Sequence, residues 1–336
     1  MNKKIFAVVS LLIILTFIGY IIWDTATSGS GTSQTEEGGE DSSPPDQWAI
    51  FKELSVTDGP LLSVAVSDDN IYLGGESYLS CYNKELSKLW YLGMPGKITA
   101  LSVNGDSVYA ASLETVSLVS TDGKMITEWG PYEANSIITS VCAGSKYVAF
   151  ADAGNKLVFI LRKNGELFSM LGQSDQKFII PSAYFDVALS GENLIYAANT
   201  GNRRIEVWTP DGVLLGNFGE PGTAPGAFCG CCNPAHFAVI PQGFVTAEKG
   251  INRLKIIGPD GGFIEFVSSE NNFMASVPLD VAADKDGKTI YAVNPVDSRL
   301  YIYRRKDSPT TLTSPLTTLK DPPTTLKDPP PPLKGG

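Results

Sequence analysis

A short apolar segment recurs six times in the sequence, and this repeat limits the possible folds more than any other feature. Its copies are Ile71-Tyr72-Leu73, Val108-Tyr109-Ala110, Val148-Ala149-Phe150, Ile195-Tyr196-Ala197, Phe244-Val245-Thr246 and Ile290-Tyr291-Ala292. Their middle residues are about 37, 40, 47, 49 and 46 positions apart, a period suited to four-stranded blades. A second apolar run precedes each copy, and turns rich in Gly, Asn and Asp separate the runs. We therefore expect an all-β fold, a six-bladed β-propeller of four-stranded antiparallel blades.

The two ends of the repeat region are complementary. The sixth blade lacks a clear outer strand, because the chain turns polar and Pro-rich after Tyr303. The segment from Trp48 to Leu54 reads as a strand without a partner of its own. Pairing this segment with the last blade closes the ring and leaves no open edge between first and last blades. We expect a closed propeller over residues 48–306, and an open solenoid of the same units is the alternative.

One blade carries a recognisable motif. The stretch Ala198-Asn199-Thr200-Gly201-Asn202-Arg203-Arg204-Ile205, followed by the turn Asp211-Gly212, resembles the NHL repeat, a β-propeller blade unit. The resemblance extends over roughly Trp48 to Tyr303 and implies the propeller fold rather than a particular chemistry. Some related propellers are lactonases, lyases or amidating lyases. The amidating-lyase pattern needs several histidines for zinc, and this chain has one.

The N-terminal region has the pattern of a membrane anchor. Lys3 and Lys4 precede an apolar run over residues 5–23, which as a helix rises about 28 Å and spans the hydrocarbon core. Residues 1–4 are then a cytoplasmic N-terminus, since the lysines stay inside. Residues 24–47 are acidic, rich in Ser and Gly, and predicted to be a disordered linker. We expect one transmembrane helix, a signal anchor in a bacterial-type cytoplasmic membrane, with the propeller on the extracytoplasmic side. A secreted protein released by signal cleavage is the alternative.

Residues 307–336 form a low-complexity, Pro-rich tail in which the heptad TTLKDPP occurs twice, at Thr317–Pro323 and Thr324–Pro330. We assign it no specific role. The whole chain carries a net charge of −10, which argues against nucleic acid as a partner, because phosphate binding needs a clustered basic surface.

Charged and polar residues recur at fixed places in the blades. A cation stands just before the third strand in four of them, and a polar residue occupies an equivalent turn. The cations are Lys156, Arg204, Arg253 and Arg299, and the turn residues are Asp152, Asn199, Glu248 and Asn294. A ring of such residues resembles a ligand site. Their repetition favours a structural role instead, in which they bond neighbouring backbone.

The repeat is interrupted at one place, between the fourth and fifth blades. The loop reads Phe228-Cys229-Gly230-Cys231-Cys232-Asn233-Pro234, with extra residues between the Phe and the Pro that end this loop in NHL repeats. It is similar to a loop in bacterial NHL-like proteins, and the resemblance brings no assigned activity. The loop connects an outer strand to an inner one, so it lies on the face where binding loops converge. Cys81 and Cys142 lie on other strands and read as small buried hydrophobes.

Three interpretations of Cys229, Cys231 and Cys232 stay open. The first is a disulfide, either Cys229–Cys232 or a vicinal Cys231–Cys232 pair, which an exported location permits. The second is a thiolate-bound metal or iron–sulfur cluster, with His236 as the fourth ligand. The third is a set of redox-active thiols. The cofactor, if any, is unknown from the sequence.

The functional expectation that follows is a binding or scaffold module that docks a protein partner, with the cysteine loop taking part. The alternative is a metal-dependent hydrolase or lyase of the lactonase type, which uses carboxylates and Asn around a divalent ion. Asp152, Asn199 and Glu248 are available for it, but the repeat already accounts for them. No nucleophile–base pair and no phosphate-binding loop is recognisable, so we favour binding over catalysis.

Overall fold

The computed structural model describes Thr16 and residues 44–173, 176–251, 253–269, 273 and 277–306. The predictions for residues 1–4, for the apolar run 5–23 apart from Thr16, for most of the 24–47 linker and for the tail 307–336 lie outside these residues. Within the described part of the chain, no helix has the length and apolar character needed to cross a membrane.

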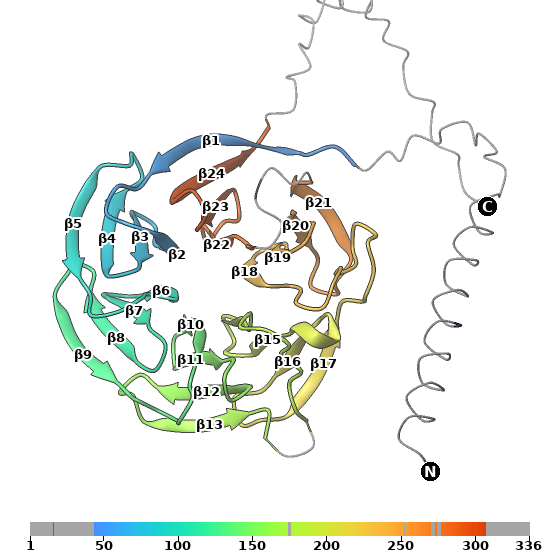
Figure 1. Ribbon diagram of the computed structural model, residues 1–336, viewed down its shortest axis with the longest axis horizontal. Coiled ribbons are helices and arrows are strands. Elements are labelled where there is room, and N and C mark those ends of the chain that lie inside the picture. Colours follow the sequence, from blue (N-terminus) through green and yellow to red (C-terminus); the bar gives the residue numbers. More distant parts are fainter. Residues whose placement is uncertain are drawn as a thin grey trace, which may run out of the picture. The chain divides into compact units, whose positions relative to one another are not determined.

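Residues 48–305 form six antiparallel sheets of four strands each, arranged in a ring (Figure 1). Blade 1 contains β2 (Leu61–Val66), β3 (Asn70–Gly75), β4 (Tyr78–Asn83) and β5 (Lys88–Gly93). Blade 2 contains β6 (Ala100–Asn104), β7 (Ser107–Ala111), β8 (Val116–Ser120) and β9 (Met125–Trp129). Blade 3 contains β10 (Ile138–Ala143), β11 (Tyr147–Asp152), β12 (Leu157–Arg162) and β13 (Leu167–Leu171).

The second half of the ring repeats the pattern. Blade 4 contains β14 (Val187–Leu189), β15 (Ile195–Asn199), the short 3₁₀ helix η1 (Thr200–Asn202), β16 (Arg204–Trp208) and β17 (Leu214–Phe218). Blade 5 contains β18 (His236–Ile240), β19 (Gly243–Ala247), β20 (Leu254–Ile257) and β21 (Phe263–Ser268). Blade 6 contains β22 (Asp280–Ala283), β23 (Thr289–Asn294) and β24 (Arg299–Arg305) from the end of the domain. The predicted all-β, six-bladed propeller is confirmed, with every copy of the apolar repeat on the second strand of its blade.

The ring is closed by the first strand of the domain. β1 (Trp48–Ser55) pairs antiparallel with β24, from Trp48 opposite Arg305 to Ser55 opposite Arg299, and supplies the outer strand of blade 6. Figure 1 shows the two strands side by side at the rim. The predicted closure by the Trp48 to Leu54 segment is confirmed, and an open solenoid is excluded.

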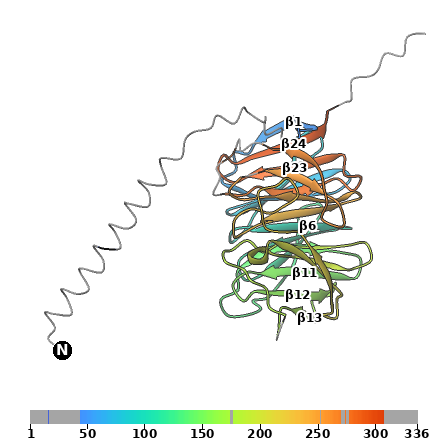
Figure 2. The same ribbon diagram turned by 90° about the vertical axis from the view of Figure 1, so that its right-hand side faces the viewer.

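The core lies between the blades rather than in one central mass. Six clusters of buried apolar side chains fill the six junctions between neighbouring blades. The second strands are almost wholly buried, as in β19, whereas an outer strand such as β9 is mostly exposed. Figure 2 shows the ring edge-on. Because each blade is held on both sides by apolar contact, the loops at its ends stand on a rigid support.

We call one face of the ring the top face. It carries the loops that lead into the inner strands and the connections between second and third strands. At this face, polar turn residues fasten the incoming loops, as their repetition predicted. Asp152 accepts hydrogen bonds from the backbone N–H groups of Ile137 at 2.9 Å and Gly154 at 2.9 Å. Asn199 accepts one from Ile179 N–H at 3.0 Å. These residues are therefore engaged in holding the blades.

The recurring cations behave less uniformly. Arg253 donates to the carbonyls of the loop between blades 4 and 5, which confirms the structural role for this position. Arg204 instead pairs with Glu206 of its own strand at 2.6 Å, and Arg299 with Glu53 of β1 at 3.4 Å. The three cations thus satisfy different local acceptors and do not point to a shared ligand.

Candidate functional site

The cysteine loop is fixed at both ends. Phe228 at its start is fully buried. Asn233 at its end is also buried, and its side chain is bonded to the backbone of Lys249 in both directions. Its amide donates to Lys249 O at 2.8 Å, and its carbonyl accepts from Lys249 N–H at 2.7 Å. A further bond runs from Asn233 Nδ2 to Cys229 O at 2.6 Å. The insertion is therefore a clamped loop, joined to the β19–β20 connection.

A buried ion network lies under this loop. The Glu248 carboxylate contacts Arg253 Nε at 2.6 Å and Lys255 Nζ at 2.9 Å, and all three side chains are almost fully buried. Lys255 also donates to Ala227 O at 2.6 Å and lies 4.4 Å from the centroid of the Phe228 ring. Loss of water contact lowers the pKa of Lys255 to about 8, and Glu248 opposes this change. Two cations share one carboxylate here, so the support under the loop is electropositive.

The three cysteines of the loop have different surroundings, and all are free thiols. Cys231 is exposed and Cys232 is buried, with their sulfur atoms 3.3 Å apart. The hydroxyl of Ser182, from the loop entering blade 4, donates to Cys232 Sγ at 3.0 Å. The Cys229 thiol faces Lys249 O at 3.9 Å instead. The loop therefore presents a pair of adjacent thiols and a third thiol directed to backbone.

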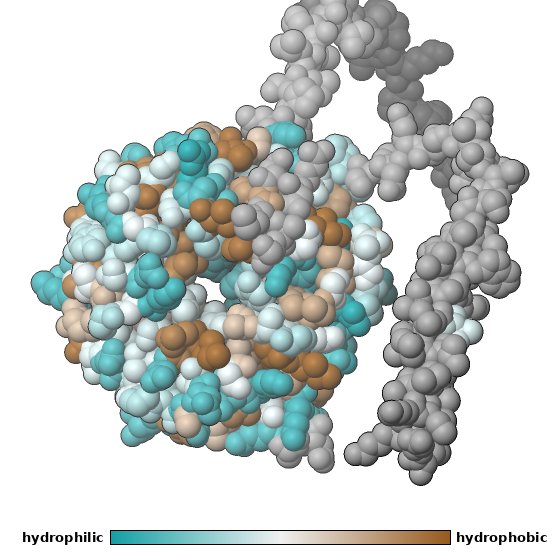
Figure 3. Space-filling view, in the orientation of Figure 1, coloured by the Kyte–Doolittle hydropathy of each residue, from teal (hydrophilic) through white to brown (hydrophobic). Residues whose placement is uncertain are grey.

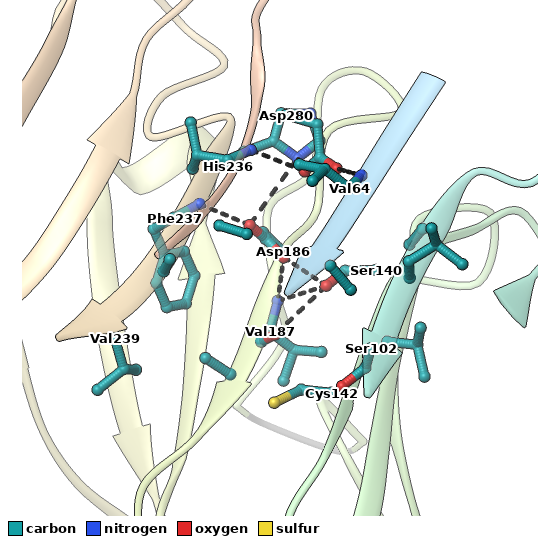
Figure 4. Close-up of a pocket in the computed structure, with 18 of the residues that line it drawn as sticks. Val64, Ser102, Ser140, Cys142, Asp186, Val187, His236, Phe237, Val239 and Asp280 are labelled. Carbon is teal, nitrogen blue, oxygen red and sulfur yellow. Dashed lines mark hydrogen bonds and ion pairs between the residues drawn. The ribbon is translucent and has the colours of Figure 1, made fainter. Parts of the chain in front are cut away.

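His236 is the first residue of β18, and its side chain lines the central channel. Its Nδ1 lies 3.6 Å from Asp280 Oδ1 and 3.8 Å from Asp186 Oδ2. Figure 4 shows the three side chains converging from the inner ends of blades 4, 5 and 6. Asp186 also accepts hydrogen bonds from the Ser140 hydroxyl and from Phe237 N–H, the latter at 2.6 Å.

These residues belong to a set of side chains that we call the polar belt, which links all six blades at the top of the channel. Its members are Ser63, Thr99, Thr139, Ser140, Asp186, His236 and Asp280. Ser63, Thr99 and Thr139 donate to the carbonyls of Ile98, Ile138 and Phe185, joining blades 1 to 2, 2 to 3 and 3 to 4. Asp186 joins blade 4 to blade 5 through Phe237 N–H, and His236 joins blade 5 to blade 6 through Asp280. Asp280 completes the circle by accepting from Val64 N–H of blade 1 at 2.8 Å.

A cavity of ≈ 440 Å³ lies in the channel and is lined by the inner strands of all six blades. The opening is visible at the centre of the ring in Figure 3. Removal from water raises the pKa of Asp280 to about 6 and raises the pKa of Asp186, and the neighbouring His236 opposes both shifts. The channel therefore has an acidic, titratable end. Its two carboxylates are also hydrogen-bonded to backbone N–H groups of neighbouring blades.

The structure does not assemble the four-ligand group of Cys229, Cys231, Cys232 and His236. His236 lines the channel cavity, and those three cysteines do not. The reason is local: the inner strand β18 begins at His236, and at this position the imidazole lines the channel. Among the described residues, no group of three or more His, Cys, Asp or Glu side chains is placed to hold a metal ion.

Sequence reasoning missed Asp186, Asp280 and Ser140. A signal was present, because a polar residue immediately precedes a buried Val or Phe at the inner-strand start in three successive blades, as Asp186-Val187, His236-Phe237 and Asp280-Val281. Only the arrangement of the blades brings these three side chains to one point.

Comparison with known proteins gives the fold and no family. No family model and no curated protein matches the sequence. A catalytically inactive variant of virginiamycin B lyase from Staphylococcus aureus, solved with quinupristin, is similar with a TM-score of 0.53 and 13% identity, over 76% of this chain and 99% of that one. A streptogramin B lyase has a TM-score of 0.55 and 14% identity, over 78% and 88%. The WD40 domain of Neurospora crassa Pan2 has a TM-score of 0.54 and 10% identity, over 79% and 98%. At such identities the likeness shows the β-propeller fold alone.

Proposed function

We propose that this protein is a binding module, an NHL-type propeller anchored in a membrane, which docks a protein partner on its top face. The observation that carries the proposal is the clamped cysteine loop. An insertion held by Asn233 and supported by the Glu248 ion network presents the exposed Cys231 on a rigid scaffold. Rigid presentation lowers the ordering cost of association, which favours a docking role for such a loop.

Binding is favoured over catalysis because the channel residues are already used. Asp186 and Asp280 accept backbone N–H groups of neighbouring blades, and His236 lies between them. A catalytic base needs an acceptor free for a substrate proton, whereas these carboxylates hold the ring together. The motif from Ala198 to Ile205 supports the NHL assignment, since Asn199 and Arg204 have structural partners.

Crosslinking on opposite faces tests the docking proposal. A photo-crosslinking residue at Ala183, exposed on the top face beside Ser182, should give one discrete protein adduct in cells that make the full-length chain. The matched control is Gln242, exposed in the β18–β19 turn at the other face. We expect adducts at position 183 only, and fewer of them in Cys231→Ala. No adduct, or equal adducts at both positions, would count against top-face docking.

The membrane part of the proposal rests on residues 5–23 and on Lys3 and Lys4. Protease added to intact spheroplasts should cut within residues 24–43 and release the propeller, because the linker and the domain then lie outside. Protection of the linker in intact spheroplasts, with cleavage only after lysis, would place the propeller inside. Release of the propeller without protease would instead support signal cleavage.

A hydrolase or lyase is the second candidate. It is favoured by one observation, the acidic end of the ≈ 440 Å³ channel cavity with His236 at its centre. Two of the fold neighbours are described as lyases. The full-length chain should be assayed for calcium-dependent lactone hydrolysis with His236→Ala as the matched variant. Hydrolysis that depends on His236 would reverse our preference for binding.

A further inference from the structure

We propose that Cys231 and Cys232 form a dithiol–disulfide couple that exchanges with a disulfide of the docked protein, while Cys229 stays outside the exchange. This inference rests on the proposed docking function and assigns a chemistry to the loop.

The exposure of the two thiols gives them different roles. Cys231 is exposed, so an incoming disulfide can reach it, whereas Cys232 is only 7% exposed. The two sulfur atoms are 3.3 Å apart. An accessible thiol can attack an incoming disulfide, and a second thiol beside it can then attack the mixed disulfide, so this arrangement suits thiol–disulfide exchange.

The surroundings of Cys232 fit the resolving role. Burial raises the pKa of the Cys232 thiol, so it is protonated at neutral pH while the exposed Cys231 meets the incoming disulfide. The Ser182 hydroxyl donates to its sulfur at 3.0 Å and is placed to stabilise the thiolate as it develops. Lys249 lies on the same side, with its Nζ 4.9 Å from the centroid of the Tyr184 ring, and also favours the thiolate. Both neighbours lower the cost of forming the thiolate, while burial keeps the pKa of Cys232 above its usual value.

Cys229 has a different environment, although it is two residues from Cys231. Its thiol faces the carbonyl of Lys249, its backbone N–H donates to Glu248 Oε2 at 3.4 Å, and its carbonyl accepts from Asn233. The first two contacts fasten the loop to the β19–β20 connection, and the third holds the loop together internally. Cys229 is therefore a part of the clamp and serves as a control for the exchange.

The exchange balances in two steps. The Cys231 thiolate attacks one sulfur of the partner's disulfide, forms a mixed disulfide and releases the first partner thiolate, which takes up the proton lost by Cys231. The Cys232 thiolate then attacks Cys231 Sγ and releases the second partner thiolate, which takes up the proton of Cys232. The pair is oxidised by two electrons and the partner's disulfide is reduced to two thiols.

Metal ligation fits the same pair less well. Two thiolates on a tetrahedral zinc ion, with Zn–S bonds of about 2.3 Å, lie about 3.8 Å apart. The sulfur atoms of Cys231 and Cys232 are closer, at 3.3 Å. His236 faces the channel and the Cys229 thiol faces Lys249, so among the residues that the structure describes no third or fourth ligand is in position.

Glutathione disulfide tests the couple without any protein partner. The reduced full-length chain and its Cys229→Ser, Cys231→Ser and Cys232→Ser variants are treated with glutathione disulfide, and the products are read by mass spectrometry. The parent and Cys229→Ser should lose two hydrogen atoms, release two glutathione molecules and keep no adduct. Cys232→Ser should retain one glutathione on Cys231, and Cys231→Ser should remain unmodified. Melting temperatures confirm that each variant is folded.

A lasting adduct on the parent chain, or an exchange lost in folded Cys229→Ser, would overturn the couple. Zinc that copurifies with the parent and is lost in all three variants would also overturn it, in favour of a metal site. If the exchange fails while the Ala183 crosslink persists, docking stands and only the thiol chemistry is wrong. If the exchange succeeds without a crosslink, the thiols are reactive but the docking function fails.

Discussion

Closure of the ring by β1 leads to a sharp prediction for Trp48. Its side chain is 4% exposed and packs in the cluster between blades 5 and 6. Its indole N–H donates to Glu265 Oε1 at 2.9 Å, so one residue of the first strand fastens blade 6 to blade 5. Replacement of a buried Trp by Ala costs roughly 3–5 kcal/mol through lost burial and the remaining cavity.

This loss of stability corresponds to a measurable shift in melting temperature. At roughly 2–4 °C per kcal/mol for a domain of this size, Trp48→Ala should lower the melting temperature by roughly 6–20 °C. The matched control is Ile50→Ala on the same strand, because Ile50 is 50% exposed and its loss should change stability by about 0.5 kcal/mol or less. Calorimetry of the full-length chain and both variants makes the comparison. Melting of Trp48→Ala within about 2 °C of Ile50→Ala would refute the inference that the Trp48 side chain fastens blade 6 to blade 5.

Two further predictions concern the channel and the loop support. The raised pKa of Asp280, about 6 against 3.8, means that the folded chain holds this proton to higher pH than the unfolded chain. The free energy of unfolding should therefore fall by up to about 3 kcal/mol as pH rises from about 4 to about 6. Asp280→Asn should lack this part of the fall when urea midpoints are measured across the same pH range. A pH profile of Asp280→Asn equal to that of the parent chain would contradict the prediction. Glu248→Ala leaves Arg253 and Lys255 without their carboxylate and should cost roughly 3–5 kcal/mol, whereas Glu220→Ala, at an exposed position, should cost little. Equal urea midpoints for the two Glu variants would show that the network does not support the loop.

The fold was accessible from the sequence because its signals are local and repeated. Each copy of the apolar repeat marks a buried second strand, and the polar sequence after Tyr303 already indicated that the last blade needs a strand from elsewhere. The inner strands were harder to delimit. In the run Phe185-Asp186-Val187-Ala188-Leu189, β14 spans only Val187–Leu189, and the Val187 N–H donates to the Ser140 hydroxyl of blade 3. Short inner strands depend on tertiary contacts that a single repeat does not contain.

The candidate site was only partly accessible from the sequence, for a reason visible at His236. Four positions separate it from Cys232, and on sequence alone this proximity favoured a shared site. Proximity along the chain does not fix the direction of a side chain, and His236 is the first residue of a strand whereas Cys232 lies in the loop. His236 instead meets Asp280, 44 residues later in the sequence (280 minus 236), because both start inner strands of adjacent blades. The register of the inner strands, and with it the polar belt, follows from the ring geometry.

The polar belt and the cysteine loop are held by different contacts but share one neighbour. The belt holds the inner ends of the blades through Asp186, His236 and Asp280, while the loop is held by Asn233 and the Glu248 network. The centroid of the Tyr184 ring lies 6.2 Å from that of the His236 ring and 4.9 Å from Lys249 Nζ, and Lys249 is bonded to Asn233. Effects of substitutions add when the sites share no partners, and here they share Tyr184. Substitutions in the belt and in the loop are therefore not expected to be strictly additive, because Tyr184 contacts both.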